Sequence, residues 1–227
     1  MTTGALPYGD AAVLVELDDL GAVRRLDDAL RAARRAGGLA AVVDVVPAAR
    51  TVLLRLAGPV PPAVLDALVH EVDGLVGAAE RDGADAASAV PAGRDGAERP
   101  VVELPVVYDG IDLTEVAAAT GLAVDEVVRR HRDATYTVAF GGFMPGFAYL
   151  VGLDDALRLP RRPTPRERVP AGSVAIADEF TAVYPAATPG GWHLVGRCPT
   201  ALFDVDRDPP ALLVPGARVR FVERRRP

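Results

Sequence analysis

The chain has 227 residues, enough for one large domain or two small ones. Half of its residues are hydrophobic, a quarter are charged and its formal net charge is −6 at pH 7, so its composition does not favour nucleic acid as a partner. Every basic residue is an arginine, and the absence of lysine excludes both Schiff-base chemistry and a P-loop lysine.

The first 77 residues alternate between short apolar runs and amphipathic segments. After Leu20 the apolar side chains recur at helical spacing, and Gly37 and Gly38 supply a C-terminal stop. The expected elements are a strand at 11–17, a helix from 20, strands at 41–46 and 51–56, and a second helix opened by Pro61 and Pro62. This β-α-β-β-α order is most of a ferredoxin-like unit, so we expect an α+β N-terminal domain at 1–77.

Residues 78–99 consist mainly of Ala, Gly, Asp, Glu and Arg without apolar periodicity, which predicts a flexible linker. The second domain, 100–227, begins with a strand at 101–107 and helices at 113–120 and 124–132, whose N-termini are favoured by Asp112 and Asp125. Short strands follow at 136–141, 173–177, 182–184, 193–196, 211–213 and 218–223. This series is typical of a closed or sandwiched β structure, and closure removes exposed strand edges.

The chain shows no sign of export or of a membrane span. No apolar run reaches the roughly 18–20 residues that a spanning helix needs, and the N-terminal residues MTTGALPYGD lack a basic-then-apolar signal. The single cysteine allows no internal disulfide. We therefore expect a cytoplasmic protein.

Glycine, proline and aromatic residues are concentrated between Phe140 and Asp204. Glycine and proline at this density specify turns and tight corners. Aromatic residues make up only 5% of the chain, yet most of them fall in this third of it. Because rings and arginines together suit a polar small-molecule site, we place the functional surface here. The aromatic residues are Phe140, Phe143, Phe147, Tyr149, Phe180, Tyr184, Trp192 and Phe203.

Residue types that often act in catalysis are few. His131 lies near the end of a predicted helix, where the helix C-terminus would raise its pKa; a packing or surface role is the alternative. Ser173 is not part of a nucleophile elbow because position 175 is alanine, and we interpret it as a turn serine entering a strand. Cys198 is interpreted as a small buried residue. Three histidines and one cysteine without CxxC or HxxxH spacing support no metal site.

Two further segments are candidates for binding. Prolines preset an extended path through residues 160–170, along which four arginines can present forks to carboxylate or phosphate; a solvated basic loop is the alternative. Gly190 and Gly191 allow a ligand to approach the backbone closely, and Trp192 would stack on it; a buried core tryptophan is the alternative.

Several motifs of this region resemble the KipI/PxpB family, also called allophanate hydrolase subunit 1 or carboxyltransferase subdomain C and D. They are Gly142–Leu150 (GFMPGFAYL), Val169–Val174 (VPAGSV), Tyr184–Trp192 (YPAATPGGW), Gly196–Arg197 and Leu202–Asp204. In the first domain, Tyr8–Ala11 and Val45–Arg50 resemble the family's opening strand and its strand–turn–strand. The similarity covers nearly the whole chain except the linker.

The resemblance implies a small α/β domain followed by a cyclophilin-like β-barrel, which agrees with the predicted elements. It also implies a subunit of a bacterial 5-oxoprolinase complex, which uses ATP to open 5-oxoproline to glutamate. The implied partners are a second carboxyltransferase-family subunit (PxpC/KipA type) and a PxpA-type subunit. Two alternatives follow from other members: a KipI-like inhibitor of a sensor histidine kinase, and a carboxyltransferase-like component of a biotin-dependent urea-type carboxylase.

The family's cleft motifs fall on residues to which we assign roles. The expected catalytic residues are Arg197, His131 and Ser173; the expected substrate-binding residues are Phe143, Phe147, Tyr149, Tyr184, Gly190, Gly191 and Trp192, with Arg161 and Arg166. If the lactam is activated by phosphorylation of its carbonyl oxygen, the arginines would hold phosphate or carboxylate. Backbone amides near the paired glycines would then stabilise an oxyanion.

One segment departs from the family pattern. After Ala177 the family typically runs Gly-x-Gln-Thr-Gly-Ile-Tyr-Pro, whereas Phe180 and Ala182 stand here in place of the glutamine and the second glycine. An amide that donates and accepts hydrogen bonds thus becomes an apolar ring. If this loop touches substrate, we expect either an altered specificity or a copy that is not catalytic.

Overall fold

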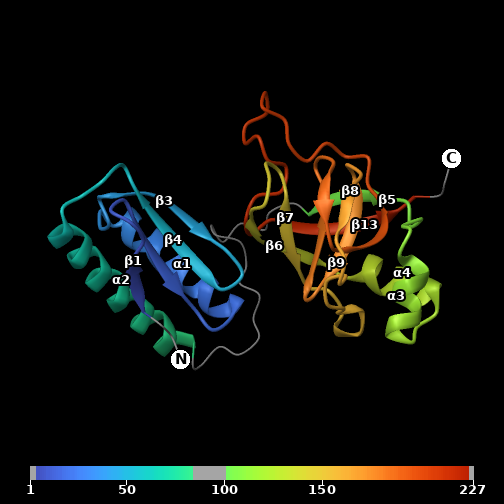
Figure 1. Ribbon diagram of the computed structural model, residues 1–227, viewed down its shortest axis with the longest axis horizontal. Helices are drawn as coiled ribbons and strands as arrows, with labels where there is room; N and C mark the ends of the chain where they lie inside the picture. The colour runs from blue at the N-terminus through green and yellow to red at the C-terminus, as the bar shows by residue number, and fades with distance from the viewer. Residues whose placement is uncertain (1–3, 84–100, 225–227) are drawn as a thin grey trace. The chain divides into compact units, whose positions relative to one another are not determined.

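The computed structural model describes residues 4–83 and 101–224, which belong to two compact units, Met1–Pro91 and Ala92–Pro227 (Figure 1). Helix α2 (Pro62–Gly83) continues past the predicted end of the first domain at residue 77. The first residues of the predicted linker are therefore helical, and the rest, 84–99, lie outside the described residues.

The N-terminal unit is a four-stranded antiparallel sheet with two helices. Its elements in chain order are β1 (Ala5–Pro7), β2 (Ala12–Glu16), α1 (Leu20–Arg35), β3 (Val42–Pro47), β4 (Thr51–Leu56) and α2, and the strand order is β1-β2-β4-β3. Helix α1 begins where the Asp19 carboxylate accepts a hydrogen bond from Ala22 N at 2.8 Å. Apolar residues of both helices and of the sheet form one core, including Val13, Leu26, Leu54 and Val72.

The predicted β-α-β-β-α order is present in this unit, preceded by a short strand, β1, that the sequence did not indicate. A mixed α/β chain is therefore confirmed, whereas the ferredoxin-like designation stays a prediction.

The C-terminal unit is built on a seven-stranded sheet. Its elements are β5 (Val102–Val106), α3 (Leu113–Thr120), α4 (Val124–Asp133), β6 (Tyr136–Gly141), β7 (Ala148–Val151), a 3₁₀ turn η1 (Asp155–Leu157), β8 (Arg166–Val169), β9 (Ser173–Ala177), β10 (Phe180–Val183), β11 (Thr188–Gly190), β12 (His193–Arg197) and β13 (Arg218–Glu223). The sheet order is β12-β9-β10-β7-β6-β13-β5, and β8 and β11 pair as a separate ribbon.

The two edges of the seven-stranded sheet meet. Val107, just after β5, exchanges two backbone hydrogen bonds with Arg197 at the end of β12, of 2.9 and 2.8 Å. The chain then follows β12, since Gly110 N donates to Val195 O at 3.2 Å and Asp112 N donates to Leu194 O at 3.0 Å. The sheet is thereby a nearly closed barrel, as the sequence predicted.

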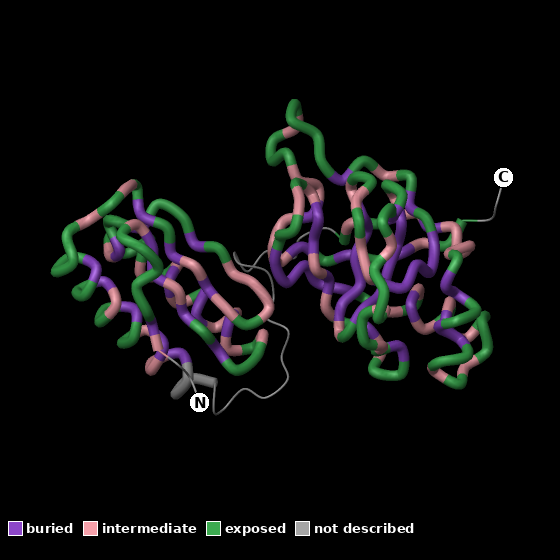
Figure 2. Tube along the Cα trace, viewed as in Figure 1, coloured by how far each residue is buried: buried purple, intermediate pink, exposed green. Residues whose placement is uncertain are grey.

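The barrel interior is apolar. Leu104, Val138, Leu150, Ile176 and Phe221 are among its fully buried side chains. Figure 2 shows the same pattern along the trace, with buried residues on the strands and exposed residues on the long connections of this unit. Burial at this density supplies most of the stabilisation of the barrel, since each large apolar side chain removed from water contributes about 1.5–3 kcal/mol.

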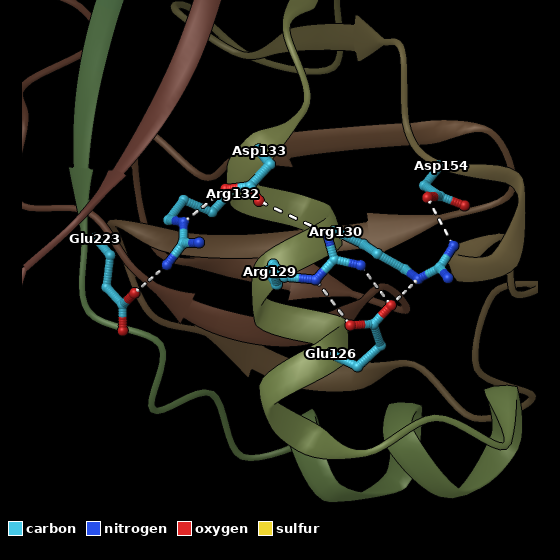
Figure 3. Close-up of polar contacts among 7 residues, drawn as sticks. All are labelled: Glu126, Arg129, Arg130, Arg132, Asp133, Asp154 and Glu223. Carbon is cyan, nitrogen blue, oxygen red and sulfur yellow. Dashed lines mark hydrogen bonds and ion pairs between the residues drawn. The ribbon is translucent and has the colours of Figure 1, made fainter.

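Helices α3 and α4 join β5 to β6 and contact each other, β12 and β13 (Figure 1). The outer face of α4 is tied down by ion pairs (Figure 3). Arg130 binds both Glu126, at 2.6 Å, and Asp154 beside η1, at 3.0 Å, while Arg132 reaches Glu223 at the end of β13, at 2.9 Å. These contacts fix the helix whose opposite side enters the barrel core.

Three predictions about local structure need correction. Residues 211–213 form no strand, and Ala211 makes only one bridge, with Phe203. Strands β7, β8 and β11 occur in segments that we interpreted as turns or as an extended loop. Asp112 makes no side-chain cap for α3, because its carboxylate is directed to other partners.

Candidate functional site

The aromatic residues of the C-terminal unit gather on the face of the sheet that does not point into the barrel. On β7, Ala148 and Leu150 belong to the barrel core, and side chains alternate along a strand, so Phe147 and Tyr149 point to the other face. On β10 the same alternation separates Val183, in the core, from Phe180. These residues thus form a second apolar group, outside the barrel.

Seven rings in this group contact one another. Phe140 stacks on Tyr149 at a centroid distance of 4.4 Å, and Phe147 meets Tyr184 and Trp192 edge-to-face at 5.3 and 5.7 Å. Most of the rings are buried, but Tyr149 is half-buried and Phe143 is 60% exposed. We call Phe140, Phe143, Phe147, Tyr149, Phe180, Tyr184 and Trp192 the aromatic cluster.

Phe143 is held at the exposed side of the aromatic cluster by an unusual backbone. Its φ is +65°, a left-handed conformation that bulky residues seldom adopt and that costs energy. Its ring lies 5.3 Å from Phe147 and 6.4 Å from Tyr184. Gly146 follows with φ +81°, and a Cβ there would lie 2.7 Å from Phe203 Cβ. The loop is therefore shaped to present one ring to solvent against the cluster.

The β8–β11 ribbon packs against Tyr184. A Cβ at Gly190 would lie 2.6 Å from the Tyr184 hydroxyl and 3.1 Å from Val169, so only glycine fits between them. Gly191 has another role, because its carbonyl accepts a hydrogen bond from Arg162 N at 2.8 Å. The structure thus brings Phe143, Phe147, Tyr149, Tyr184 and Trp192 into one cluster, with the paired glycines beside it.

The three arginines expected at the site have different partners. Arg166 contacts the buried carboxylate of Asp112, and Arg197 binds Asp109 through both its Nε and its Nη2, with Nε to Oδ1 at 2.9 Å. Arg161 is paired only loosely, its Nε lying 3.8 Å from Asp178 Oδ2. Two of the three guanidinium groups are therefore engaged within the protein.

His131 lies in the barrel core, away from the solvent-exposed edge of the aromatic cluster, with 1% of its surface exposed. Thr181 Oγ1 donates to Ala175 O at 3.0 Å, so its single proton is used and it accepts from His131 Nε2 at 2.9 Å. His131 Nδ1 then accepts from the Tyr108 hydroxyl at 2.8 Å. Burial lowers the pKa of His131 to about 3, so the expectation of a raised pKa is wrong.

Ser173 is also engaged within the fold. Its hydroxyl donates to Pro170 O at 2.8 Å, and the residue is 3% exposed at the start of β9. The preceding residue, Gly172, has φ +79°, and a Cβ there would lie 2.5 Å from Cys198 O. Cys198 itself is buried, as predicted. This corner therefore holds β9 against the end of β12.

Asp112 is the residue of this region whose importance the sequence did not reveal. It is 3% exposed, and its Oδ2 accepts from Leu194 N at 2.7 Å. Its Oδ1 contacts both Arg166 and, at 3.2 Å, Arg162, which also binds Glu115 at 2.6 Å. One buried carboxylate thus fastens the arginine-proline segment to β12. A position before a helix signals a cap, and nothing local distinguishes it from a distant ion pair.

Comparison with known proteins gives a consistent result. A family model described as carboxyltransferase domain, subdomain C and D, matches residues 3–213. The chain is 40% identical over 217 residues to a 5-oxoprolinase subunit of Escherichia coli O157:H7, and the match covers 94% of this chain and 93% of that protein. It is 46% identical over 127 residues to the 5-oxoprolinase subunit of the same designation in Bacillus subtilis, across 55% of this chain and 53% of that protein.

Solved structures share the fold. The structure of TTHA0988 is similar with a TM-score of 0.71 at 35% identity, covering 95% of this chain but only 40% of that longer chain. The urea carboxylase of Kluyveromyces lactis matches with a TM-score of 0.69 at 18% identity, over 99% of this chain and 23% of that one. Within residues 4–83 and 101–224, no helix is long and apolar enough to cross a membrane.

Proposed function

The chain belongs to the family described as carboxyltransferase domain, subdomain C and D, and on this basis we propose that it is a subunit of an ATP-dependent 5-oxoprolinase complex. In the proposed reaction the lactam C–N bond of 5-oxoproline is cleaved, water is added across it, and glutamate is released. The observation that carries the proposal is the 40% identity to a known 5-oxoprolinase subunit along nearly the full length of both chains.

The chemistry of the aromatic cluster suits a lactam ring. The faces of such a ring are apolar apart from the amide, and the exposed side of Phe143 and the half-buried Tyr149 offer aromatic surface against which it packs. Burial raises the pKa of Tyr184 to about 12, so its hydroxyl stays protonated at neutral pH and is a hydrogen-bond donor for a carbonyl oxygen. We therefore place the lactam beside these three residues.

We place the nucleotide on another subunit of the complex. Arg166 and Arg197, which we expected to hold phosphate, bind the carboxylates of Asp112 and Asp109. A phosphate would have to displace those carboxylates before it gained either guanidinium. The proposed partners are the second carboxyltransferase-family subunit and the PxpA-type subunit, and the isolated chain is expected to be inactive.

The test is reconstitution with omission. This chain is mixed with its candidate partner subunits, ATP and 5-oxoproline, glutamate release is measured, and each subunit is then left out in turn. Loss of activity when this chain is omitted supports the proposal, and activity that does not depend on this chain refutes it. Carboxylation of urea by the chain together with a biotin carboxylase would refute it in favour of carboxyl transfer, for which the likeness to urea carboxylase shows only the fold.

A further inference from the structure

Among the three arginines expected at the site, Arg161 differs in what its guanidinium already binds. Arg166 and Arg197 have carboxylates within hydrogen-bond distance, namely those of Asp112 and Asp109. Arg161 and Asp178 are separated by 3.8 Å, beyond hydrogen-bond distance, and their side chains are 61% and 55% exposed. An ion pair of this kind between exposed groups contributes little stability, so a ligand displaces it at small cost.

The backbone holds Arg161 in place on both sides. Asp178 N donates to Leu159 O at 2.6 Å, and Arg162 N donates to Gly191 O at 2.8 Å. The second bond attaches the chain next to Trp192, because Gly191 is its immediate neighbour. Arg162 is further fixed through its side chain to the buried Asp112. An exposed, mobile side chain is thus carried by a backbone that is itself anchored at the aromatic cluster.

The charge of Arg161 reaches the polar atoms of the aromatic cluster. Burial raises the pKa of both Tyr149 and Tyr184, and the positive charge of Arg161 opposes this rise in both. An effect on both phenols requires the guanidinium to lie near each of them, because the influence of an exposed charge is screened within about 10 Å. Arg161 therefore lies at the side of the aromatic cluster that carries its two hydroxyl groups.

We propose that Arg161 is the specificity-determining residue that binds the carboxylate of a small cyclic acid whose ring packs on Phe143 and Tyr149. A guanidinium presents two parallel N–H groups that match a carboxylate. The exposed Phe143, held in a strained conformation, supplies apolar surface beside Tyr184 for the ring. This inference rests on the proposed function, since 5-oxoproline combines a lactam ring with a carboxylate.

The first test uses the only tryptophan of the chain, Trp192, which belongs to the aromatic cluster and reports on it alone. The full chain is titrated with 5-oxoproline and with 2-pyrrolidinone, which has the same ring without the carboxylate, while tryptophan fluorescence is recorded. We expect a saturable change with 5-oxoproline that is at least roughly tenfold weaker in affinity in Arg161→Ala, because a charge-assisted bidentate contact is lost. Arg161→Lys should recover part of that affinity.

A matched control is available three residues earlier. Arg158 is 49% exposed and pairs with Asp155 at 2.7 Å, and Arg158→Ala should leave the titration unchanged. We expect 2-pyrrolidinone to bind weakly and equally to the wild type and to Arg161→Ala. Equal affinity of 5-oxoproline for the wild type and Arg161→Ala would overturn the inference, as would equal affinity of both ligands for the wild type or the absence of any saturable change.

The second test separates this inference from the proposed function. In the reconstituted complex, Arg161→Ala should raise KM for 5-oxoproline at least roughly tenfold with a smaller change in kcat, since the residue binds a part of the substrate that does not react. If the wild-type complex is active and the variant has the same KM, the inference fails and the function stands. If the wild-type complex is inactive while the Arg161-dependent titration is observed, the function fails and the inference stands.

Discussion

Replacing the buried Asp112 with asparagine tests whether this carboxylate fastens the arginine-proline segment to β12. Asparagine keeps the shape but removes the charge that binds Arg162 and Arg166, and its NH₂ group cannot accept from the donors that one of the two oxygens now serves. Breaking a fully buried ion pair costs about 3–5 kcal/mol. The arginine side chains are 24% and 21% exposed and Arg162 keeps Glu115, so water and this second partner reduce the expected loss to about 2–3 kcal/mol.

The measurement is urea unfolding followed by the fluorescence of Trp192, which reports on the C-terminal unit alone. The control is Glu103→Gln, which removes an ion pair with Arg220 whose side chains are 54% and 53% exposed. That variant should change the free energy of unfolding by less than about 0.5 kcal/mol. A loss below about 1 kcal/mol in Asp112→Asn, or an equal loss in both variants, would refute the reasoning from burial.

Three further predictions concern the same unit. His131 is neutral in the folded state and is protonated in the unfolded chain below pH 6.5, so it should remove ~1.4 kcal/mol of stability per pH unit as the pH falls from 6.5 toward 3, a dependence that His131→Gln should abolish in urea titrations at pH 7 and pH 5. Gly172→Ala should cost more than about 3 kcal/mol in the same assay because its Cβ meets Cys198 O, whereas Gly121→Ala, with φ +70° and open space around it, should cost about 1 kcal/mol, and equal costs would contradict this explanation. The buried Cys198 thiol should react with Ellman's reagent only at the rate of unfolding, and fast reaction in the absence of urea would show that it is accessible.

Elements set by local pattern could be predicted from the sequence. The structure gives β4, α3, β6, β9 and β13 the predicted bounds, because each is an apolar or amphipathic run ended by Gly, Pro or a polar turn. Strands β8 and β11 could not be predicted in this way. Their sequences, RERV and TPG, carry little apolar pattern, and they are strands because each pairs with the other across about twenty residues of chain.

The candidate site divides in the same manner. The aromatic cluster was predicted because its rings are concentrated in one third of the sequence, and the structure brings them together on one face. The partners of Asp112 lie 50, 54 and 82 residues further along the chain, and no local pattern encodes such contacts. The same limit applies to His131, whose pKa is set by burial beneath segments that are remote in the sequence.

The way in which the chain covers β12 restricts how a second protein can attach to the barrel. The segment from Val107 to Asp112 already uses the outward backbone groups of Arg197, Val195 and Leu194. A partner therefore cannot extend the barrel sheet by laying a strand of its own along this edge, the mode of association that depends on main-chain hydrogen bonds. Attachment there has to use side chains and loops, so its strength should respond to single substitutions on the surface of the barrel.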